Sequence, residues 1–255
     1  NITERRPDGY HNLETIFLPV ALTDELEIVA SDEFSFVQEG IMLDNKPEDN
    51  LCVKAYRLME ARYAEVGPVA MRLKKNIPFG AGLGGGSADA AFVLTLLREL
   101  FHLTATDEDL EQMAAQIGAD CAFFVRNQPA YATGIGDQLE PIDVDLKDYR
   151  LVLLKPEDHV ATREAYAGIR PQPSKADLRD CVKRPVEEWK DCINNDFEAS
   201  VFPHHPRIAA LKDWLYRKGA LYAAMSGSGA AVFGLFRKTA IVDLNELPAE
   251  EILLR

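Results

Sequence analysis

The sequence predicts an α+β fold, because short strands and amphipathic helices follow one another without the regular strand–helix alternation of a parallel sheet. The strand expected over residues 69–75 alternates apolar and polar side chains, which is typical of a half-exposed strand in an antiparallel sheet. With 255 residues, the chain can bury a large core in one or two domains.

In the N-terminal half, alternating apolar residues predict strands at 15–19, 25–30, 34–38, 69–75, 130–133 and 137–141. Apolar residues at spacings of three and four predict helices at 50–66, 87–102 and 107–117. Ser87 and Thr106 are the expected N-caps of the second and third helices. Asp89, just inside the second helix, is expected to complement the helix dipole.

The acidic segment 143–148 is the expected boundary between two domains, residues 1–147 and 148–255. Beyond it, the pattern predicts strands at 149–154 and 232–236 and helices at 185–194, 206–218 and part of 247–253. His204 and His205 are expected in a solvated loop, and Glu250 and Glu251 at a solvated helix start. No His or Cys spacing typical of a metal site is evident.

The composition is that of an ordinary globular protein, with 27% charged and 47% hydrophobic residues. A net charge of −13 argues against a nucleic-acid partner, whose phosphates require a basic surface. No apolar stretch is long enough to cross a membrane, so no membrane association is expected. The four cysteines are far apart and contain no CxxC pair, which favours free thiols in a reducing cytoplasm.

The most informative segment is the glycine-rich stretch from Gly80 to Gly86, which precedes an apolar-periodic helix. Glycines allow backbone N–H groups to approach a ligand, and a helix N-terminus adds free N–H groups and positive dipole. The combination predicts a phosphate-binding loop. A flexible linker is the alternative, but a linker is not normally followed by so regular a helix.

Two common phosphate motifs fit incompletely. Residues 80–85 satisfy G-x-G-x-x-G, but the preceding strand is half-exposed rather than the buried strand of a dinucleotide fold. Residues 80–87 approach the P-loop pattern, but Gly86 stands where that pattern requires lysine. An NAD(P)-dependent oxidoreductase is therefore a distant alternative.

A third pattern fits completely, because residues 78–88 read PFGAGLGGGSA and resemble the phosphate motif of the GHMP kinases. Three more segments resemble that family in the same order: RPDGYHNLE from Arg6, GADCAFF from Gly118 and MSGSGA from Met225. The chain most resembles the branch that phosphorylates the 2-hydroxyl of a cytidyl-diphosphate-linked sugar alcohol. The resemblance implies an S5-like N-terminal lobe, a ferredoxin-like C-terminal lobe, an active site between them, and ATP and Mg²⁺ as cofactors.

The resemblance implies roles for individual residues. Asp120 is the implied catalytic carboxylate, which would accept or orient the proton of the attacking hydroxyl. Without the resemblance, a structural role for Asp120 in capping a turn is equally plausible. The residues implied for ATP and phosphate binding are Pro78, Phe79, Gly80, Ala81, Gly82, Leu83, Gly84, Gly85, Gly86, Ser87 and Ala88, with Asn50 and Lys75 toward the adenine. Ser87 is also the implied Mg²⁺ contact, and its alternative role is a plain N-cap; Asn50 could equally cap the helix that follows it.

The substrate residues implied by the resemblance are Tyr10, His11 and Tyr166, which would stack on and hydrogen-bond a cytosine ring. Taken alone, Tyr10 and His11 would be surface residues and Tyr166 a core residue. The turn from Ser226 to Gly229 would buttress the phosphate loop, contact phosphate, or simply join two strands. Rival functions are a homoserine or mevalonate type of GHMP kinase and a catalytically inactive nucleotide-binding regulator; the presence of Asp120 argues against the second.

The family also implies a lysine on a strand that precedes Tyr10 by about fifteen residues, beside the catalytic aspartate. The sequence begins at Asn1, so we expect this lysine upstream of the printed residues. The physical reason is that a carboxylate at an anionic site needs a cation to stay ionised.

Overall fold

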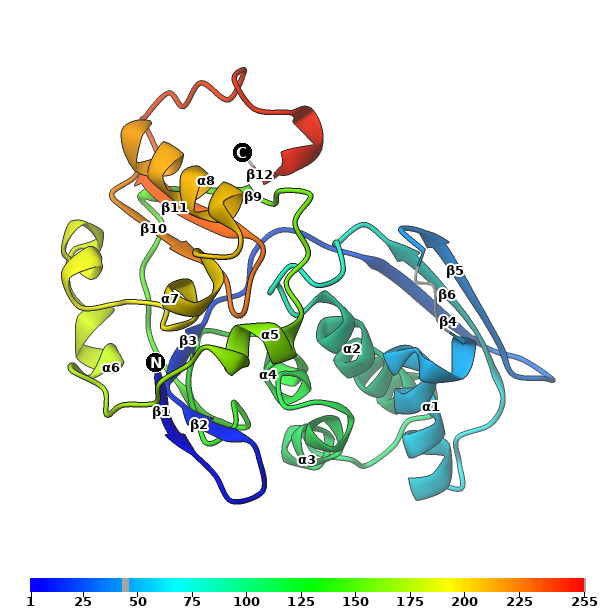
Figure 1. The fold of residues 1–255 in the computed structure, drawn as a ribbon. Helices are drawn as coiled ribbons and strands as arrows, with labels where there is room; N and C mark the ends of the chain where they lie inside the picture. The colour runs from blue at the N-terminus through cyan, green and yellow to red at the C-terminus, as the bar shows by residue number, and fades with distance from the viewer. Residues whose placement is uncertain (43–45, 255) are drawn as a thin grey trace. The chain divides into compact units, whose positions relative to one another are not determined.

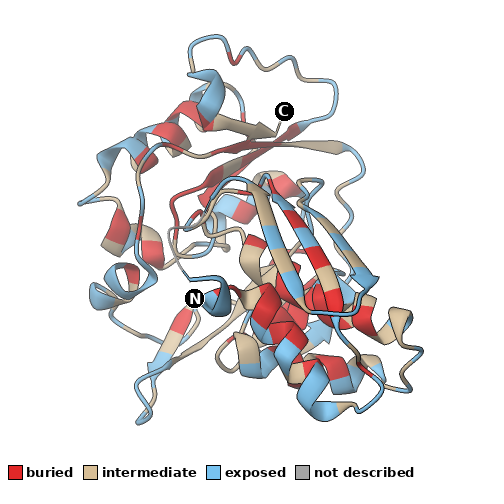
Figure 2. Ribbon diagram, turned by 90° about the vertical axis from the view of Figure 1, so that its right-hand side faces the viewer, coloured by how far each residue is buried: buried red, intermediate tan, exposed pale blue. Residues whose placement is uncertain are grey.

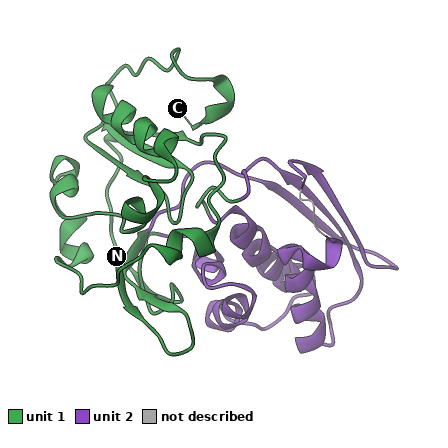
Figure 3. Cartoon of the chain, viewed as in Figure 1, with its two compact units in different colours: residues 1–16, 80–83, 129–255 green, residues 17–79, 84–128 purple. Residues whose placement is uncertain are grey.

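The computed structural model describes residues 1–42 and 46–254. The chain forms two compact units, which differ in colour in Figure 3. Unit 1 contains residues 1–16, 80–83 and 129–255, and unit 2 contains residues 17–79 and 84–128. The units follow contacts rather than chain order, so they do not coincide with the predicted domains 1–147 and 148–255, which stay a prediction.

Unit 2 is a three-stranded sheet covered by helices (Figure 1). Its elements are β4 (Glu25–Ala30), β5 (Ser35–Gly40), η1 (Pro47–Asp49), α1 (Leu51–Arg62), β6 (Val69–Lys75), α2 (Gly85–Leu100), α3 (Asp107–Ile117) and α4 (Cys121–Arg126). The central strand β6 pairs antiparallel with β4 and parallel with β5. α1 and α2 pack against each other over a core shared with the buried face of β6.

The alternation predicted for residues 69–75 is confirmed, since buried and exposed positions alternate along β6 (Figure 2). Val69, Met71 and Leu73 point into the core, and Lys75 occupies the next position on the same face. The Thr106 cap is confirmed as well, because its hydroxyl accepts a hydrogen bond from the Asp109 N–H and Asp109 bonds back to Thr106. This capping box fixes the start of α3.

Unit 1 is built on a four-stranded antiparallel sheet in the order β10-β11-β9-β12, with α8 packed against β10 and β11. Its remaining strands form the β1–β2 hairpin and the sheet β3-β7-β8. The strands are β1 (Ile2–Arg5), β2 (His11–Leu13), β3 (Thr15–Phe17, which ends in unit 2), β7 (Ala130–Thr133), β8 (Gln138–Pro141), β9 (Tyr149–Leu154), β10 (Tyr222–Met225), β11 (Val232–Arg237) and β12 (Ile252–Leu254). The helices are α5 (Thr162–Ala167), α6 (Leu178–Cys181), η2 (Val186–Asp191), α7 (Phe197–Val201), α8 (Pro206–Arg217) and η3 (Ala249–Glu251).

One predicted helix of unit 1 is wrong in type, and the partial helix predicted within residues 247–253 is present only as a short 3₁₀ helix. Residues 185–194 form only the 3₁₀ helix η2, which starts after Pro185 and ends at Asp191. Residues 247–253 form the short η3, and then Ile252 begins β12, which pairs with β9. The apolar residues at 252–254 are half-buried at a sheet edge, where they pair with β9 over a long range that local periodicity does not reveal.

Two further surface assignments are wrong because the residues find distant partners. Glu251 is buried, and its carboxylate receives hydrogen bonds from the guanidinium of Arg207. His205 is half-buried between the carboxylates of Asp158 and Glu164. The four cysteines are free thiols in the structure. Within residues 1–42 and 46–254, no helix has the length and apolar character needed to span a membrane.

Candidate active site

The glycine-rich loop has the backbone geometry of an anion-binding segment. Gly80, Gly82 and Gly84 have positive φ angles of 61°, 71° and 67°. Among the described residues, the backbone N–H groups of residues 80–87 donate to no protein acceptor. Free donors that are held in place beside a helix N-terminus favour the oxygens of phosphate.

The first part of the loop rests on the Ser226–Gly229 turn within unit 1. The Ser226 hydroxyl donates to the Gly82 carbonyl at 2.8 Å, and the Ala231 N–H donates to the Ala81 carbonyl at 3.0 Å. A Cβ on Gly82 would lie 2.1 Å from the Ser226 carbonyl oxygen. The predicted buttressing role of this turn is therefore what the contacts show.

The second part of the loop leads into α2, which begins earlier than predicted. Gly84 is the N-cap in a left-handed conformation and Gly85 is the first helical residue, so Ser87 lies inside the first turn and the prediction that it caps the helix is wrong. The Ser87 hydroxyl instead lies beside the Cys121 thiol at the start of α4, where it partly offsets the rise that burial causes in the pKa of that thiol. The flanking positions Pro78, Phe79, Leu83, Gly86 and Ala88 are half-buried along this segment.

Asp120 is the N-cap residue of α4, directly before Cys121, and its side chain does not cap the helix. The residue keeps an exposed surface, but crowding by surrounding protein atoms raises the pKa of the Asp120 carboxyl. In the part of the chain that the structure describes, no ion pair or hydrogen bond engages this carboxylate. It is therefore available to a ligand hydroxyl.

Asn50 and Lys75 occupy buried positions with their polar atoms engaged. The Asn50 side-chain oxygen accepts from the Cys52 N–H at 2.9 Å, which makes Asn50 the N-cap of α1, and its amide donates to Gln38. The Lys75 ammonium is 1% exposed and lies between the carboxylates of Asp24 and Asp89. Its Nζ to Asp89 Oδ2 distance is 2.8 Å.

Asp89, which is predicted to complement the helix dipole, also forms a buried ion pair that the sequence analysis did not anticipate. The residue is buried against Lys75. Burial raises the pKa of Asp89 to about 7, because desolvation and the neighbouring Asp24 outweigh the attraction of Lys75. The two carboxyl groups therefore surround one ammonium in a water-poor environment.

The predicted substrate residues lie in unit 1. The His11 and Tyr166 rings stack with centroids 4.8 Å apart, although the two residues are far apart in sequence. Tyr166, on α5, also meets the Phe197 ring edge to face at 4.8 Å. Tyr10, at the tip of the β1–β2 hairpin, is 61% exposed and remains open to a planar ligand.

The loop between β9 and α5 is held by His205. Its Nδ1 lies 3.1 Å from Asp158 in the loop, and its Nε2 lies 3.1 Å from Glu164 on α5. The same loop carries His159, whose ring lies so close to Gly80 that a Cβ there would come within 2.3 Å. Sequence reasoning missed this tie, because only the fold brings residue 205 to residues 158 and 164.

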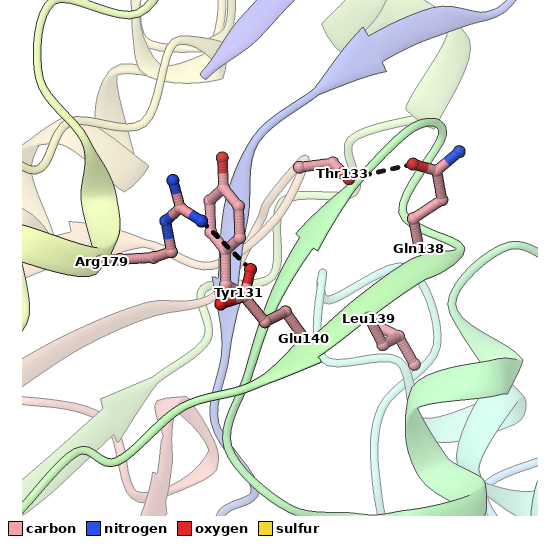
Figure 4. A pocket seen from close by; sticks show the side chains of 6 residues that line it. All are labelled: Tyr131, Thr133, Gln138, Leu139, Glu140 and Arg179. Carbon is pink, nitrogen blue, oxygen red and sulfur yellow. Dashed lines mark hydrogen bonds and ion pairs between the residues drawn. The ribbon is translucent and has the colours of Figure 1, made fainter.

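A cavity of about 520 Å³ elsewhere in unit 1 lacks these features (Figure 4). Its lining residues are Tyr131, Thr133, Gln138, Leu139, Glu140 and Arg179. The Arg179 guanidinium already pairs with Asp177 and Glu140, so it offers no unpaired cation to a phosphate. No cluster of three or more potential metal-binding His, Cys, Asp or Glu side chains occurs in residues 1–42 and 46–254.

Comparison with known proteins agrees with this geometry. Residues 50–128 match the model of the GHMP kinase N-terminal domain, and residues 178–251 match that of the GHMP kinase C-terminal domain. The chain is 55% identical over 240 residues to the 4-diphosphocytidyl-2-C-methyl-D-erythritol kinase of Bacteroides fragilis, covering 92% of this chain and 87% of that protein. It belongs to the 4-diphosphocytidyl-2-C-methyl-D-erythritol kinases of the GHMP family.

Solved structures extend the comparison. A crystal structure of 4-(cytidine 5′-diphospho)-2C-methyl-D-erythritol kinase matches with a TM-score of 0.77 and 30% identity, covering 92% of this chain and 84% of that one. The homoserine kinase of Cytophaga hutchinsonii matches with a TM-score of 0.69 at 17% identity, covering 89% and 86%. The latter likeness shows the fold alone. The predicted α+β GHMP fold is thereby confirmed.

We predict that Gly82→Ala raises the KM for ATP about tenfold or more. Any alanine at a positive φ costs about 1–2 kcal/mol, and here the new Cβ must also displace the Ser226 carbonyl. Gly219→Ala is the matched control, because Gly219 has a φ of 95° but open space around it. Steady-state kinetics give the KM for ATP of both variants. An equal rise in the two variants would show that the contact with the Ser226 carbonyl is not the cause.

We predict that His205→Gln destabilises the protein more at pH 6 than at pH 8.5. Burial alone lowers the pKa of His205, but Asp158 and Glu164 outweigh it and hold the pKa above its ordinary value. The stabilisation is therefore full below the unfolded-state pKa of about 6.5, and it is lost as the pH rises through the folded-state value.

Urea unfolding at the two pH values measures the difference. The loss at pH 6 should be on the order of 1 kcal/mol, and it should shrink at pH 8.5. His204→Gln is the control, because His204 is the exposed neighbour. A pH-independent loss for His205→Gln would show that the imidazolium charge contributes nothing.

Proposed function

We propose that the chain transfers the γ-phosphoryl group of ATP to the 2-hydroxyl of 4-diphosphocytidyl-2-C-methyl-D-erythritol. The observation that carries the proposal is the loop from Gly80 to Ser87, whose backbone N–H groups have no protein acceptor among the described residues. The chain is also 55% identical to a kinase named for that substrate. The chain is a kinase with an alcohol acceptor, and this activity belongs to non-mevalonate isoprenoid precursor synthesis.

The chemistry needs little more than placement and charge stabilisation. The loop N–H groups and the α2 N-terminus would hold the phosphate oxygens of ATP. Asp120 would accept, or orient, the proton of the acceptor hydroxyl, because its carboxylate has no protein partner among the described residues. In these roles the acceptor hydroxyl oxygen bonds to the γ-phosphorus of ATP as ADP leaves, and Asp120 accepts or orients the hydroxyl proton.

Mg²⁺ fits this site as a companion of the nucleotide. The chain offers the single hydroxyl of Ser87 beside the loop, and Mg²⁺ commonly takes its other ligands from substrate phosphates and water. When bound, the ion would neutralise phosphate charge. The described residues hold no preformed cluster of three or more metal ligands.

Tyr10, His11 and Tyr166 would recognise the cytosine ring by stacking and hydrogen bonding. The exposed Tyr10 ring and the stacked His11–Tyr166 pair supply planar surfaces that a base can use. Homoserine and mevalonate have no base, so these aromatic residues would give them no binding energy. We further propose that the protein works in the cytoplasm, where its free thiols are stable.

Asp120→Asn should retain ATP binding and lose about 10²–10⁴-fold in kcat, because the amide keeps the shape of the carboxylate but cannot accept the proton. Asp213→Asn, on the exposed side of α8, is the matched control and should leave kcat unchanged. Near-normal turnover by Asp120→Asn would assign Asp120 a structural role.

Tyr10→Ala or His11→Ala should raise the KM for the cytidyl substrate while the KM for ATP stays nearly constant. Loss of one stacking partner is worth about 1–3 kcal/mol, which corresponds to a roughly five- to hundredfold effect. Assays with the cytidyl substrate, free methylerythritol, homoserine and mevalonate test the same point. Efficient phosphorylation of homoserine or mevalonate would remove the cytidyl assignment.

A further inference from the structure

Lys75, which the resemblance implies toward the adenine, is a buried cation that takes no part in the phosphoryl transfer proposed above. The side chains of Lys75, Asp24 and Asp89 are 1%, 4% and 8% exposed, so all three charged groups have left water. Burying charges is favourable only where their mutual geometry compensates the loss of hydration. The cluster therefore fixes the chain segments that carry Lys75, Asp24 and Asp89 close to one another.

Two of the three residues come from the segments that flank the phosphate loop, and Asp24 comes from the segment directly before β4. Lys75 ends β6, immediately before the loop, and Asp89 lies in the first turns of α2, immediately after it. The Lys75 ammonium bonds to both Asp89 and Asp24, so it joins the two flanks across the base of the loop. The Phe79 ring adds a cation–π contact at 5.2 Å from Nζ.

Asp24 extends this tie to the backbone. Its Oδ1 accepts hydrogen bonds from the Asn76 N–H at 2.6 Å and the Ile77 N–H at 2.8 Å. One carboxylate therefore fixes the direction in which the chain leaves β6 and enters the loop. Its second oxygen receives the Lys75 ammonium.

Gly85 shows how closely α2 sits on this cluster. A Cβ on Gly85 would lie 2.8 Å from the Ile77 side chain and 3.0 Å from the Lys75 ammonium nitrogen. The first helical residue therefore packs directly on Ile77 and on the cation. Displacing the cation displaces the helix N-terminus, which supplies donors for phosphate.

We propose that Asp24, Lys75 and Asp89 are positioning residues for ATP, which act by fixing both ends of the phosphate loop rather than by touching the nucleotide. The proposal rests on the proposed function in so far as the loop binds the phosphates of ATP. It assigns the effect of Lys75 to the geometry of the loop, because the ammonium faces two carboxylates and not solvent.

The test uses Asp24→Asn, Asp89→Asn and Lys75→Met in the full chain, with Lys74→Met as the matched control. Lys74 directly precedes Lys75 on β6, and it forms an exposed ion pair with Glu25 on the outer face. We expect the dissociation constant of MgADP and the KM for ATP to rise about tenfold or more in the three variants. The KM for the cytidyl substrate should stay within about twofold, and Lys74→Met should behave as the wild type.

Cooperative unfolding verifies that each variant is folded. If Lys75→Met fails to fold, Asp89→Asn decides, because it retains the Lys75–Asp24 ion pair and the shape of the side chain. Unchanged MgADP binding in folded variants, or an equal rise of both KM values, overturns the proposal. A wild-type protein that binds MgADP but does not phosphorylate the cytidyl substrate would overturn the proposed function and leave this inference standing.

Discussion

The ion cluster around Lys75 constrains unit 2 because a buried ammonium leaves few acceptable arrangements around it. Removing one partner from a buried ion pair typically costs about 3–5 kcal/mol, since the remaining charge is left uncompensated. Here β6, the turn at Asp24 and the start of α2 must all remain in contact with one nitrogen atom. Hydrophobic packing of α1 and α2 alone would tolerate small shifts of these elements. The cluster therefore sets their register where the phosphate loop begins and ends.

The phosphate loop differs from the ion cluster because its backbone N–H groups have no protein partner among the described residues. Backbone N–H groups withheld from protein acceptors are costly unless water or a ligand satisfies them. The close contact of Gly82 with the Ser226 turn leaves no room for a side chain, so glycine is required by space as well as by φ. Gly84, against the Phe124 ring, meets the same double requirement. Each of the two glycines is therefore confined by its own neighbours, while the loop N–H groups have no protein acceptor among the described residues, which suits them to an anion.

Local sequence predicted the features that depend on near neighbours. The alternation along β6, the periodicity of α2 and the N-cap at Thr106 all arise within a few residues, and all are confirmed. β12 could not be predicted in this way, because Ile252 becomes a strand only when β9 offers a free edge. Lys75 is an intermediate case. The alternation that places Val69, Met71 and Leu73 on the buried face also places Lys75 there, whereas its partners Asp24 and Asp89 are brought to it only by the fold.

The proposed base-binding residues could not be predicted from local sequence, because no local pattern connects His11 with Tyr166. Their stacking is a product of the fold, and only the family resemblance indicated them. The contact has an energetic consequence for the proposed function. Aromatic pairs contribute about 0.5–1.5 kcal/mol beyond their buried area. A base that separates the two rings must exceed that contribution, whereas one that stacks on the exposed Tyr10 ring keeps it. Under the proposed function, the His11–Tyr166 pair is therefore retained when the base stacks on Tyr10.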